Sequence, residues 1–233
     1  MRCVFFDVDD TIYDQFSPFR SAFKGVFGHR FDALNLERLF VCSRARSDEV
    51  FEMVACGELT ESEMYAYRIC KAFEDCGAFL SQEDGLAFQE VYATEQQKIK
   101  LLPDMVCIFD HLQAKGVPMG IITNGPEAHQ MRKVQTLGLK KWIASEHFLI
   151  SSEVGAAKPA TAIFREAERR LGVLPKACTY IGDAYAIDVV GAKCAGWRAI
   201  WLNRRENTIP EDAVYFPDYE VKNERALAQL LLK

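Results

Sequence analysis

The 233-residue sequence has no apolar run long enough to cross a membrane and no Cys-x-x-Cys pair. Its eight cysteines stand singly, and its first ten residues, MRCVFFDVDD, carry acids where a secretory signal would need an apolar stretch. Secreted disulfide scaffolds and membrane-spanning proteins are therefore poor matches. We expect a cytoplasmic protein with reduced thiols.

A surplus of basic residues is also missing. Lysine and arginine total 28 against 33 aspartate and glutamate residues, and the formal net charge is -5. Binding to nucleic acid or to an anionic membrane depends on basic side chains that contact phosphates. The composition therefore argues against both kinds of partner. At this length the chain can form one large domain or a main domain with a smaller insert.

The sequence does contain two alternating patterns. Short runs that are apolar on both faces predict strands at residues 2–7, 117–123, 147–151, 178–183 and 198–203. Apolar residues at helical spacing predict helices over 104–115, 127–137 and 160–171, each followed by a glycine. Strands that alternate with helices imply right-handed crossovers. The predicted fold class is therefore α/β, a doubly wound parallel sheet with helices on both faces.

Residues 15–97 interrupt this alternation and show no convincing strand pattern. Four phenylalanines from Phe16 to Phe27 recur at helical spacing, which is typical of an amphipathic helix. We therefore expect two domains. Residues 1–14 and 98–233 form an α/β core, and residues 15–97 form a helical domain inserted after the first strand.

Polar residues stand at the ends of the predicted strands and at the start of one predicted helix. They are Asp7, Asp9 and Thr11 after the first strand, Thr123 and Asn124 after the second, Lys158 before a proline, and Gly182, Asp183 and Asp188 at and beyond the fourth. The carboxyl ends of parallel strands meet at one edge of a sheet, where α/β proteins bind their ligands. We expect these side chains to form one site.

In this order the residues resemble the four motifs of the haloacid dehalogenase superfamily. The motifs are D-x-D-x-T (Asp7, Asp9, Thr11), a Ser or Thr that ends a hydrophobic strand (Thr123), a Lys often before Pro (Lys158), and G-D-x-x-x-x-D (Gly182, Asp183, Asp188). The resemblance covers most of the chain. It implies a Rossmann-like core and a helical cap of subclass I at residues 15–97.

The clustered acids also indicate a cation on physical grounds. At an effective dielectric constant near 20, two carboxylates about 4 Å apart repel each other by about 4 kcal/mol. Ligands that are all oxygen favour a hard cation such as Mg²⁺. The resemblance implies that Asp7, Asp183 and the backbone carbonyl of Asp9 hold this Mg²⁺. It places Asp188 behind them, where it holds metal-bound water or Lys158.

The resemblance also implies the chemical steps. Asp7 is the nucleophile that forms an aspartyl-phosphate. Asp9 protonates the leaving oxygen and then activates the water that cleaves this intermediate. Thr123, Asn124 and Lys158 bind the phosphoryl oxygens.

The acid at position 9 discriminates among activities within the family. Haloacid dehalogenases lack an acid two residues after the nucleophile, because a halide leaves without a proton whereas an alkoxide needs one. The neighbouring Asp10 is an extra acid that we expect to cap the following turn. The predicted function is therefore that of a phosphohydrolase. A phosphomutase of the β-phosphoglucomutase type and a non-catalytic phospho-acceptor or binding module remain as alternatives.

The stretch TNGPEAHQMRKVQTLGL resembles the branch of the family that contains 5′-nucleotidases and sugar-phosphate phosphatases. We therefore expect a small phosphoester substrate, either a nucleotide 5′-monophosphate or a sugar phosphate, and a monomer or homodimer. The resemblance implies that the cap sets substrate preference. We name Phe19, Arg44 and Arg46 as the cap residues that would set it.

Overall fold

The computed structural model describes residues 2–232, with residues 52 and 55 described by their backbone alone. The chain packs as two compact units. One unit combines the residues up to Asp14 with those from Lys100 onward, and the other is Gln15–Ile99. We call them the core unit and the helical unit.

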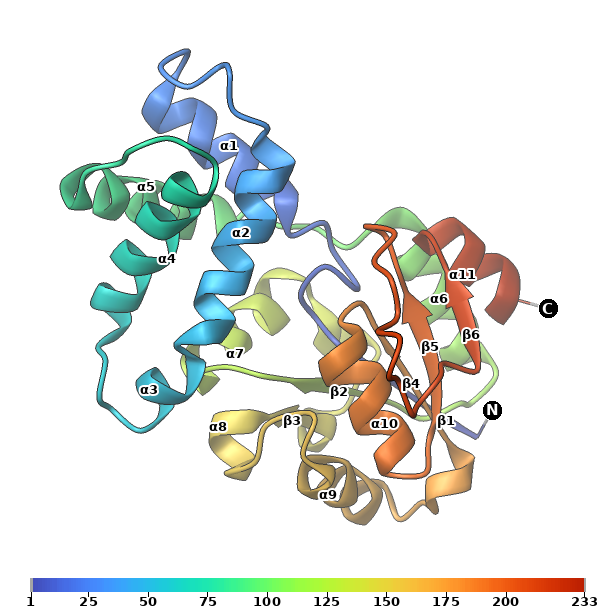
Figure 1. Ribbon diagram of the computed structural model, residues 1–233. Helices are drawn as coiled ribbons and strands as arrows, with labels where there is room; N and C mark the ends of the chain where they lie inside the picture. Colours follow the sequence, from blue (N-terminus) through green and yellow to red (C-terminus); the bar gives the residue numbers. More distant parts are fainter. Residues whose placement is uncertain (1, 233) are drawn as a thin grey trace. The chain divides into compact units, whose positions relative to one another are not determined.

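The core unit is built on a six-stranded parallel sheet with the order β3-β2-β1-β4-β5-β6 (Figure 1). The strands are β1 (Cys3–Phe6), β2 (Met119–Thr123), β3 (Phe148–Ile150), β4 (Cys178–Gly182), β5 (Arg198–Leu202) and β6 (Tyr219–Val221). After β1 the chain builds outward through β2 and β3, then returns to the other side of β1 and builds outward through β4, β5 and β6. The prediction of a doubly wound parallel sheet is confirmed.

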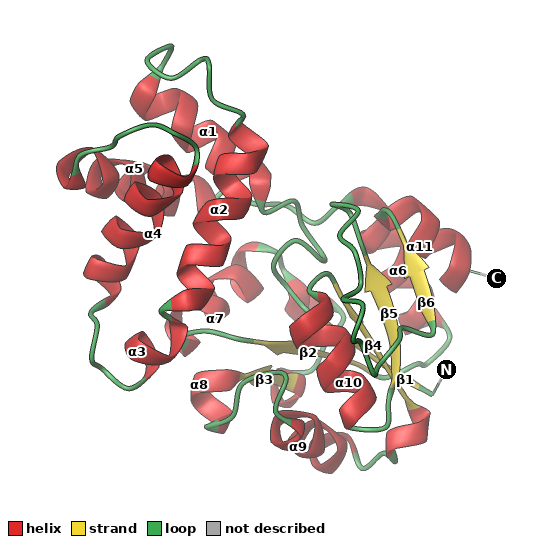
Figure 2. Ribbon diagram, viewed as in Figure 1, coloured by secondary structure: helices red, strands yellow, loops and turns green. Residues whose placement is uncertain are grey.

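Helices cover both faces of this sheet (Figure 2). Helices α6 (Pro103–Ala114) and α11 (Glu224–Leu231) pack together on one face, and α9 (Thr161–Leu171) and α10 (Val190–Cys194) pack together on the other. Successive residues of β1 point to opposite faces, as strand geometry requires. The ring of Phe5 lies 4.9 Å from that of Trp197, and the ring of Phe6 lies 4.9 Å from that of Phe109. β1 is therefore buried between two apolar layers.

The remaining helices and helical turns of the core unit lie between these elements along the chain. They are α7 (Glu127–Thr136), α8 (Ser151–Val154), a π-helical turn at Tyr185–Val189, and 3-10 turns at Leu139–Lys141, Ser145–His147 and Pro175–Ala177. The three helices predicted for the core correspond to α6, α7 and α9, with bounds that differ by one residue or so. Gly172 ends α9 in the left-handed region at φ 63, as its position after the apolar pattern predicted.

The sequence did not predict β6 or α11. β6 has three residues, Tyr219, Glu220 and Val221, which are exposed or half-buried. The sequence of β6 therefore lacks the run of residues, apolar on both faces of the strand, that predicted the other strands. It is held by pairing with β5 in the register Trp201 to Glu220.

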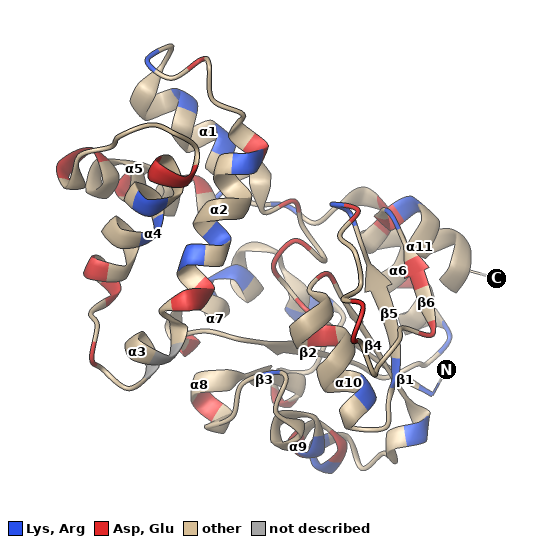
Figure 3. Ribbon diagram, in the orientation of Figure 1, with Lys and Arg blue, Asp and Glu red and all other residues tan. Residues whose placement is uncertain are grey.

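The helical unit consists of α1 (Phe16–Phe27), α2 (Leu36–Glu49), α3 (Phe51–Ala55), α4 (Glu61–Asp75) and α5 (Gln82–Gln96). Its interior is rich in aromatic rings that pack edge to face and stacked. Figure 3 shows basic and acidic residues interspersed along these helices. Ion pairs join several of them, including Lys71 with Glu74 and Arg30 with Asp84.

Two of the residues named as substrate-contacting candidates have structural contacts within the helical unit. Phe19 is 1% exposed, and its ring lies 5.0 Å from that of Phe88 and 5.3 Å from that of Phe40. Arg46 forms ion pairs of 2.8 Å with Asp75 and Glu49. Phe19 is therefore a core residue of this unit, and the Arg46 guanidinium already has two carboxylate partners.

In the described part of the chain, no helix combines the length and the apolar character needed to cross a membrane. All eight cysteines are free thiols.

Candidate active site

The site lies where the central strands of the core unit end. Asp7 directly follows β1, Thr123 is the last residue of β2, and Gly182 is the last residue of β4. β2 and β4 are the two neighbours of β1, so parallel pairing brings these three ends to one edge of the sheet. The backbone N–H of Asp7 continues the ladder by donating to the carbonyl of Ile181 at 2.9 Å.

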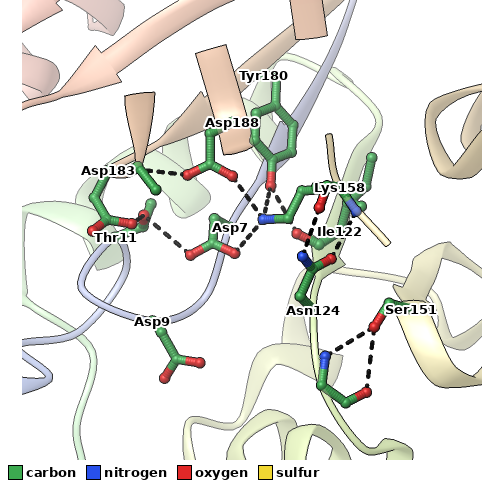
Figure 4. A network of polar contacts seen from close by, with 12 residues as sticks. Asp7, Asp9, Thr11, Ile122, Asn124, Ser151, Lys158, Tyr180, Asp183 and Asp188 are labelled. Carbon is green, nitrogen blue, oxygen red and sulfur yellow. Dashed lines mark hydrogen bonds and ion pairs between the residues drawn. The ribbon is translucent and has the colours of Figure 1, made fainter. Parts of the chain in front are cut away.

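Lys158 is the centre of the polar network at this edge (Figure 4). It is 5% exposed, and its Nζ lies 2.6 Å from Asp7 Oδ1, 2.7 Å from Asp188 Oδ1 and 2.7 Å from the Tyr180 hydroxyl. Tyr180 in turn donates to the carbonyl of Ile122 at 2.7 Å. Burial disfavours the ammonium, but the facing carboxylates of Asp188 and Asp7 outweigh it and raise the pKa of Lys158. Lys158 is therefore held as a cation.

The side chain of Asn124 fixes the backbone of Lys158. Its Nδ2 donates to the Lys158 carbonyl at 2.9 Å, and its Oδ1 accepts from the Lys158 N–H at 2.9 Å. Both polar ends of the amide are thus engaged in anchoring the segment that carries the lysine. The prediction that Asn124 binds a phosphoryl oxygen therefore remains for its backbone N–H, and this prediction is untested.

Asp188 supports the lysine from the turn after β4. Its Oδ1 pairs with Lys158, and its Oδ2 accepts from the Ala184 N–H at 2.9 Å. A Cβ built on Gly182 would lie 2.3 Å from Asp188 Oδ2. A glycine is therefore required at position 182, because any side chain there would displace Asp188.

Three carboxylates converge with this single lysine. Oxygens of Asp7, Asp183 and Asp188 all lie within 4.8 Å of one another. Burial, the charge of Asp188 and the charge of Asp9 raise the pKa of Asp7 to about 7, although Lys158 opposes the shift. Burial, together with Asp188 and Asp7, raises the pKa of Asp183 well above its ordinary range. When all three carboxylates are ionised, they carry more negative charge than one ammonium offsets, and their oxygen atoms suit a hard divalent cation.

Thr11 lies between two of these acids. Its hydroxyl is 3.5 Å from Asp7 Oδ2 and 3.5 Å from Asp183 Oδ1. Thr11 is the last residue of the D-x-D-x-T motif and is fully buried. The Asp183 backbone is held separately, because its carbonyl accepts from Trp201 Nε1 at 2.7 Å.

Asp9 is turned away from this network, as Figure 4 shows. Its two carboxylate oxygens each lie 2.6 Å from Nζ of Lys133, and the Tyr13 hydroxyl also donates to it. Gln130 Nε2 lies 3.3 Å from Asp9 Oδ2. Neither Lys133 nor Gln130 was predicted from the sequence to lie at the site. The sequence held one signal for Lys133: it lies on the same face of α7 as the apolar residues, where a buried side chain is expected.

Asp10 has a left-handed backbone conformation with φ 55. Its carboxylate accepts from Arg205 at 2.9 Å and 2.6 Å, and its carbonyl accepts from Arg204 at 3.0 Å. The C-terminal part of the core unit thus anchors the loop that follows β1.

Known proteins resemble this chain over nearly its whole length. The chain is 25% identical to glyceraldehyde 3-phosphate phosphatase of Methanopyrus kandleri, with 99% of this chain and 97% of that protein covered. It is 27% identical to pyrimidine 5′-nucleotidase YjjG of Escherichia coli, with 99% and 97% covered. The structure of L-2-haloacid dehalogenase from Xanthobacter autotrophicus matches with a TM-score of 0.72 at 18% identity, covering 100% and 98% of the two chains, and shows a shared fold.

A family model described as haloacid dehalogenase-like hydrolase matches residues 1–196. This range contains every strand-end residue of the site, from Asp7 to Asp188, and more than half of the chain. The protein belongs to the haloacid dehalogenase-like hydrolases.

Proposed function

We propose that this protein is a Mg²⁺-dependent phosphohydrolase that acts on a small phosphorylated metabolite through an aspartyl-phosphate on Asp7. One observation carries the proposal. Asp7 lies at the end of the central strand, against a buried lysine and among further carboxylates, with a second acid two residues along the loop. Relatives with named phosphatase activity, such as the glyceraldehyde 3-phosphate phosphatase and the 5′-nucleotidase, support it.

In the first step, a carboxylate oxygen of Asp7 attacks phosphorus and the bond from phosphorus to the ester oxygen breaks. Lys158 already contacts Asp7 at 2.6 Å, so an incoming phosphoryl oxygen would meet a cation beside the attacking atom. Thr123, at the end of the neighbouring strand, and the backbone N–H of Asn124 supply further donors. These groups act on the phosphoryl moiety, which all phosphoester substrates share.

Asp9 supplies the proton that the leaving alkoxide needs. In the second step, Asp9 removes a proton from water, and the water oxygen attacks the phosphorus of the aspartyl-phosphate. Inorganic phosphate leaves and Asp7 is regenerated. A dehalogenase needs no such acid, so the presence of Asp9 favours phosphoester chemistry over the dehalogenation carried out by some members of the family.

The oxygen-rich group of Asp7 and Asp183 fits Mg²⁺, with the backbone carbonyl of Asp9 as a further ligand. Asp188 uses both of its oxygens on Lys158 and on the Ala184 N–H, which suits a supporting role. Bound Mg²⁺ would offset the charge of the carboxylates and of the phosphoryl group.

For the substrate, we propose a nucleotide 5′-monophosphate or a sugar phosphate. The support comes from the named relatives, which act on a phosphorylated triose and on pyrimidine 5′-nucleotides. We assign residues 15–99 the role of a cap that sets substrate preference.

A panel of phosphorylated metabolites, assayed for phosphate release with Mg²⁺ and with EDTA, tests the proposal. We expect turnover with Mg²⁺, none with EDTA, and none in Asp7→Asn, which keeps the shape of the side chain but cannot attack. Acid quenching during turnover should trap phosphate on Asp7 in the wild type. Substantial hydrolysis by a folded Asp7→Asn protein would rule out the covalent mechanism.

A further inference from the structure

Two cysteines face each other at the end of the sheet opposite to Asp7. Cys3 is the first residue of β1 and Cys178 is the first residue of β4, and the two are paired in register on these neighbouring parallel strands. Their Sγ atoms lie 3.2 Å apart, and both residues are 0% exposed. Neither belongs to the polar network around Lys158, so the chemistry proposed above does not use them.

The backbone at this pair suits a disulfide. Neighbouring strands of a sheet lie about 4.8 Å apart. Disulfides connect residues whose Cα atoms are about 4.4 to 6.8 Å apart. Cys3 and Cys178 therefore already have a backbone separation that a disulfide accepts, and the sulfurs need only a change in side-chain torsion angles to meet. The separation is near the short end of the range, so the bond would be strained and correspondingly easy to reduce.

The two thiols differ in acidity. The contact with Cys178 lowers the pKa of Cys3, although burial opposes this shift. The contact with Cys3 and burial both raise the pKa of Cys178. Cys3 is therefore the thiol that ionises first, and the thiolate is the form that attacks an oxidant. Cys178 remains a thiol directly beside it.

The pair lies beneath a short connection at the surface. Cys3 Sγ is 3.6 Å from the carbonyl of Ala177, and Cys178 Sγ is 3.4 Å from the carbonyl of Leu174. Leu174 is 77% exposed, and the 3-10 turn Pro175–Ala177 connects it to β4. Short surface turns open at a lower free-energy cost than the whole domain. Local opening of this turn would therefore admit a small oxidant to both sulfurs while the strands stay paired.

We infer that Cys3 and Cys178 are a site of reversible oxidation, at which a hydroperoxide converts the two thiols into a disulfide that links β1 to β4. The inference is independent of the proposed function. Cysteines that serve only as apolar core residues would be inert toward the same oxidant.

The chemistry has two steps. With hydrogen peroxide, the Cys3 thiolate attacks one oxygen, the O–O bond breaks, and hydroxide leaves and takes up a proton to become water. Cys3 is then a sulfenic acid. The Cys178 sulfur attacks the Cys3 sulfur, the S–S bond forms, and the S–O bond breaks. The second hydroxide leaves with the proton of Cys178 as water, so the two thiols lose two electrons in total and the peroxide gains them.

Peptide mapping of the full-length protein tests the site. The reduced protein is treated with hydrogen peroxide, its remaining thiols are alkylated in denaturant, and it is digested without reduction. We expect mass spectrometry to find a peptide pair that joins Cys3 to Cys178, and we expect dithiothreitol to remove it. Absence of this pair at a peroxide concentration that already oxidises Cys107, an exposed cysteine, would overturn the inference.

Two variants test the order of the steps. Cys178→Ala removes the second thiol, so the sulfenic acid on Cys3 should persist and react with dimedone, a reagent for sulfenic acids. Cys3→Ala removes the attacking thiolate, so dimedone should not label Cys178. Label on Cys178 in place of Cys3, or on neither residue, would contradict the inference. If either variant fails to fold, the cross-link in the wild type still decides the question.

Cys42→Ala is the matched control. Cys42 contacts Cys76 in the helical unit, so this change removes one thiol from a second pair. We expect the link from Cys3 to Cys178 to form in this variant with the same yield as in the wild type. A link that requires Cys42 would show that thiols of the helical unit supply it by exchange, and the assignment of direct oxidation would fail. None of these measurements depends on turnover.

Discussion

At Gly182, the absence of a side chain determines how a neighbouring acid is held. Alanine would place a Cβ 2.3 Å from Asp188 Oδ2 and force that carboxylate to move. Asp188 would then lose its contacts with Lys158 and with the Ala184 N–H. We expect Gly182→Ala to lower kcat for every substrate by a similar factor, roughly 10- to 100-fold, since a small displacement in an active site can have an effect of this size.

The matched control for this change is Gly25→Ala in helix α1. A Cβ there would meet only Val91 Cγ1, at an ordinary 3.8 Å. We expect unchanged turnover and a slightly raised melting temperature, because alanine is the better helix former. Equal turnover in Gly182→Ala and the wild type would contradict the role assigned to Asp188.

The raised pKa of Asp7 predicts how the metal-free protein responds to pH. With a pKa of about 7, above its ordinary 3.8, Asp7 binds its proton more tightly in the folded than in the unfolded state. The stability that this provides is present at low pH and is lost as pH rises toward about 7. Each unit of such a shift corresponds to about 1.4 kcal/mol at most. In EDTA, the wild type should therefore lose stability relative to Asp7→Asn between about pH 4 and 7.

Melting temperatures of the two proteins across this pH range provide the measurement. We expect the curves to diverge as pH rises, with Asp7→Asn the more stable protein at the alkaline end. Addition of Mg²⁺ should raise the melting temperature of the wild type more than that of the variant. Parallel curves in EDTA would show that Asp7 titrates normally.

The residues of the strand-end network could be named from the sequence because they follow apolar strands in a fixed order. Lys133 and Gln130 could not, since a lysine on a helix is usually solvated and nothing in the local pattern shows what it faces. Their partner, Asp9, is more than 120 residues away in the chain. Only the folded sheet brings α7 beside the loop after β1.

At the scale of elements, strands buried on both faces were predicted because a doubly covered parallel sheet requires continuous apolar runs. This is why β1, β2, β3, β4 and β5 were found and the short, more exposed β6 was not. The π-helical turn at Tyr185–Val189 was also missed, because no sequence pattern distinguishes it from an ordinary helix start. The register of β6 is set by its pairing with β5, a tertiary contact that no local sequence pattern shows.

Helix α1 is held to the rest of the helical unit by Phe19, which contacts Phe40 and Phe88. We expect Phe19→Ala to destabilise this unit by about 3–5 kcal/mol, the usual effect of emptying a buried aromatic position. Thermal unfolding followed by circular dichroism measures the loss. Phe79→Ala is the control, because Phe79 is 75% exposed and should be nearly neutral. A change in substrate preference without loss of stability would restore Phe19 as a substrate contact.

At the scale of the whole molecule, the helical unit is one continuous segment with its own apolar interior. We expect residues 15–99, expressed alone, to fold into a cooperative helical domain. Circular dichroism should show high helicity and a single thermal transition. The transition should disappear in the same fragment with Phe19→Ala. A fragment that stays unfolded would show that the unit depends on the core unit for its stability.

The position of β1 in the sheet has a consequence for biosynthesis. β1 is made before both of its neighbours in the sheet, which begin at Met119 and Cys178. On the ribosome, the segment Cys-Val-Phe-Phe must therefore wait, unpaired and apolar, while the whole helical unit emerges and folds through local contacts. The nascent chain thus carries an unpaired strand next to a folded helical unit until β2 and β4 have been made. Chaperones that bind short apolar segments would find a target at the strand that directly precedes Asp7, the proposed nucleophile.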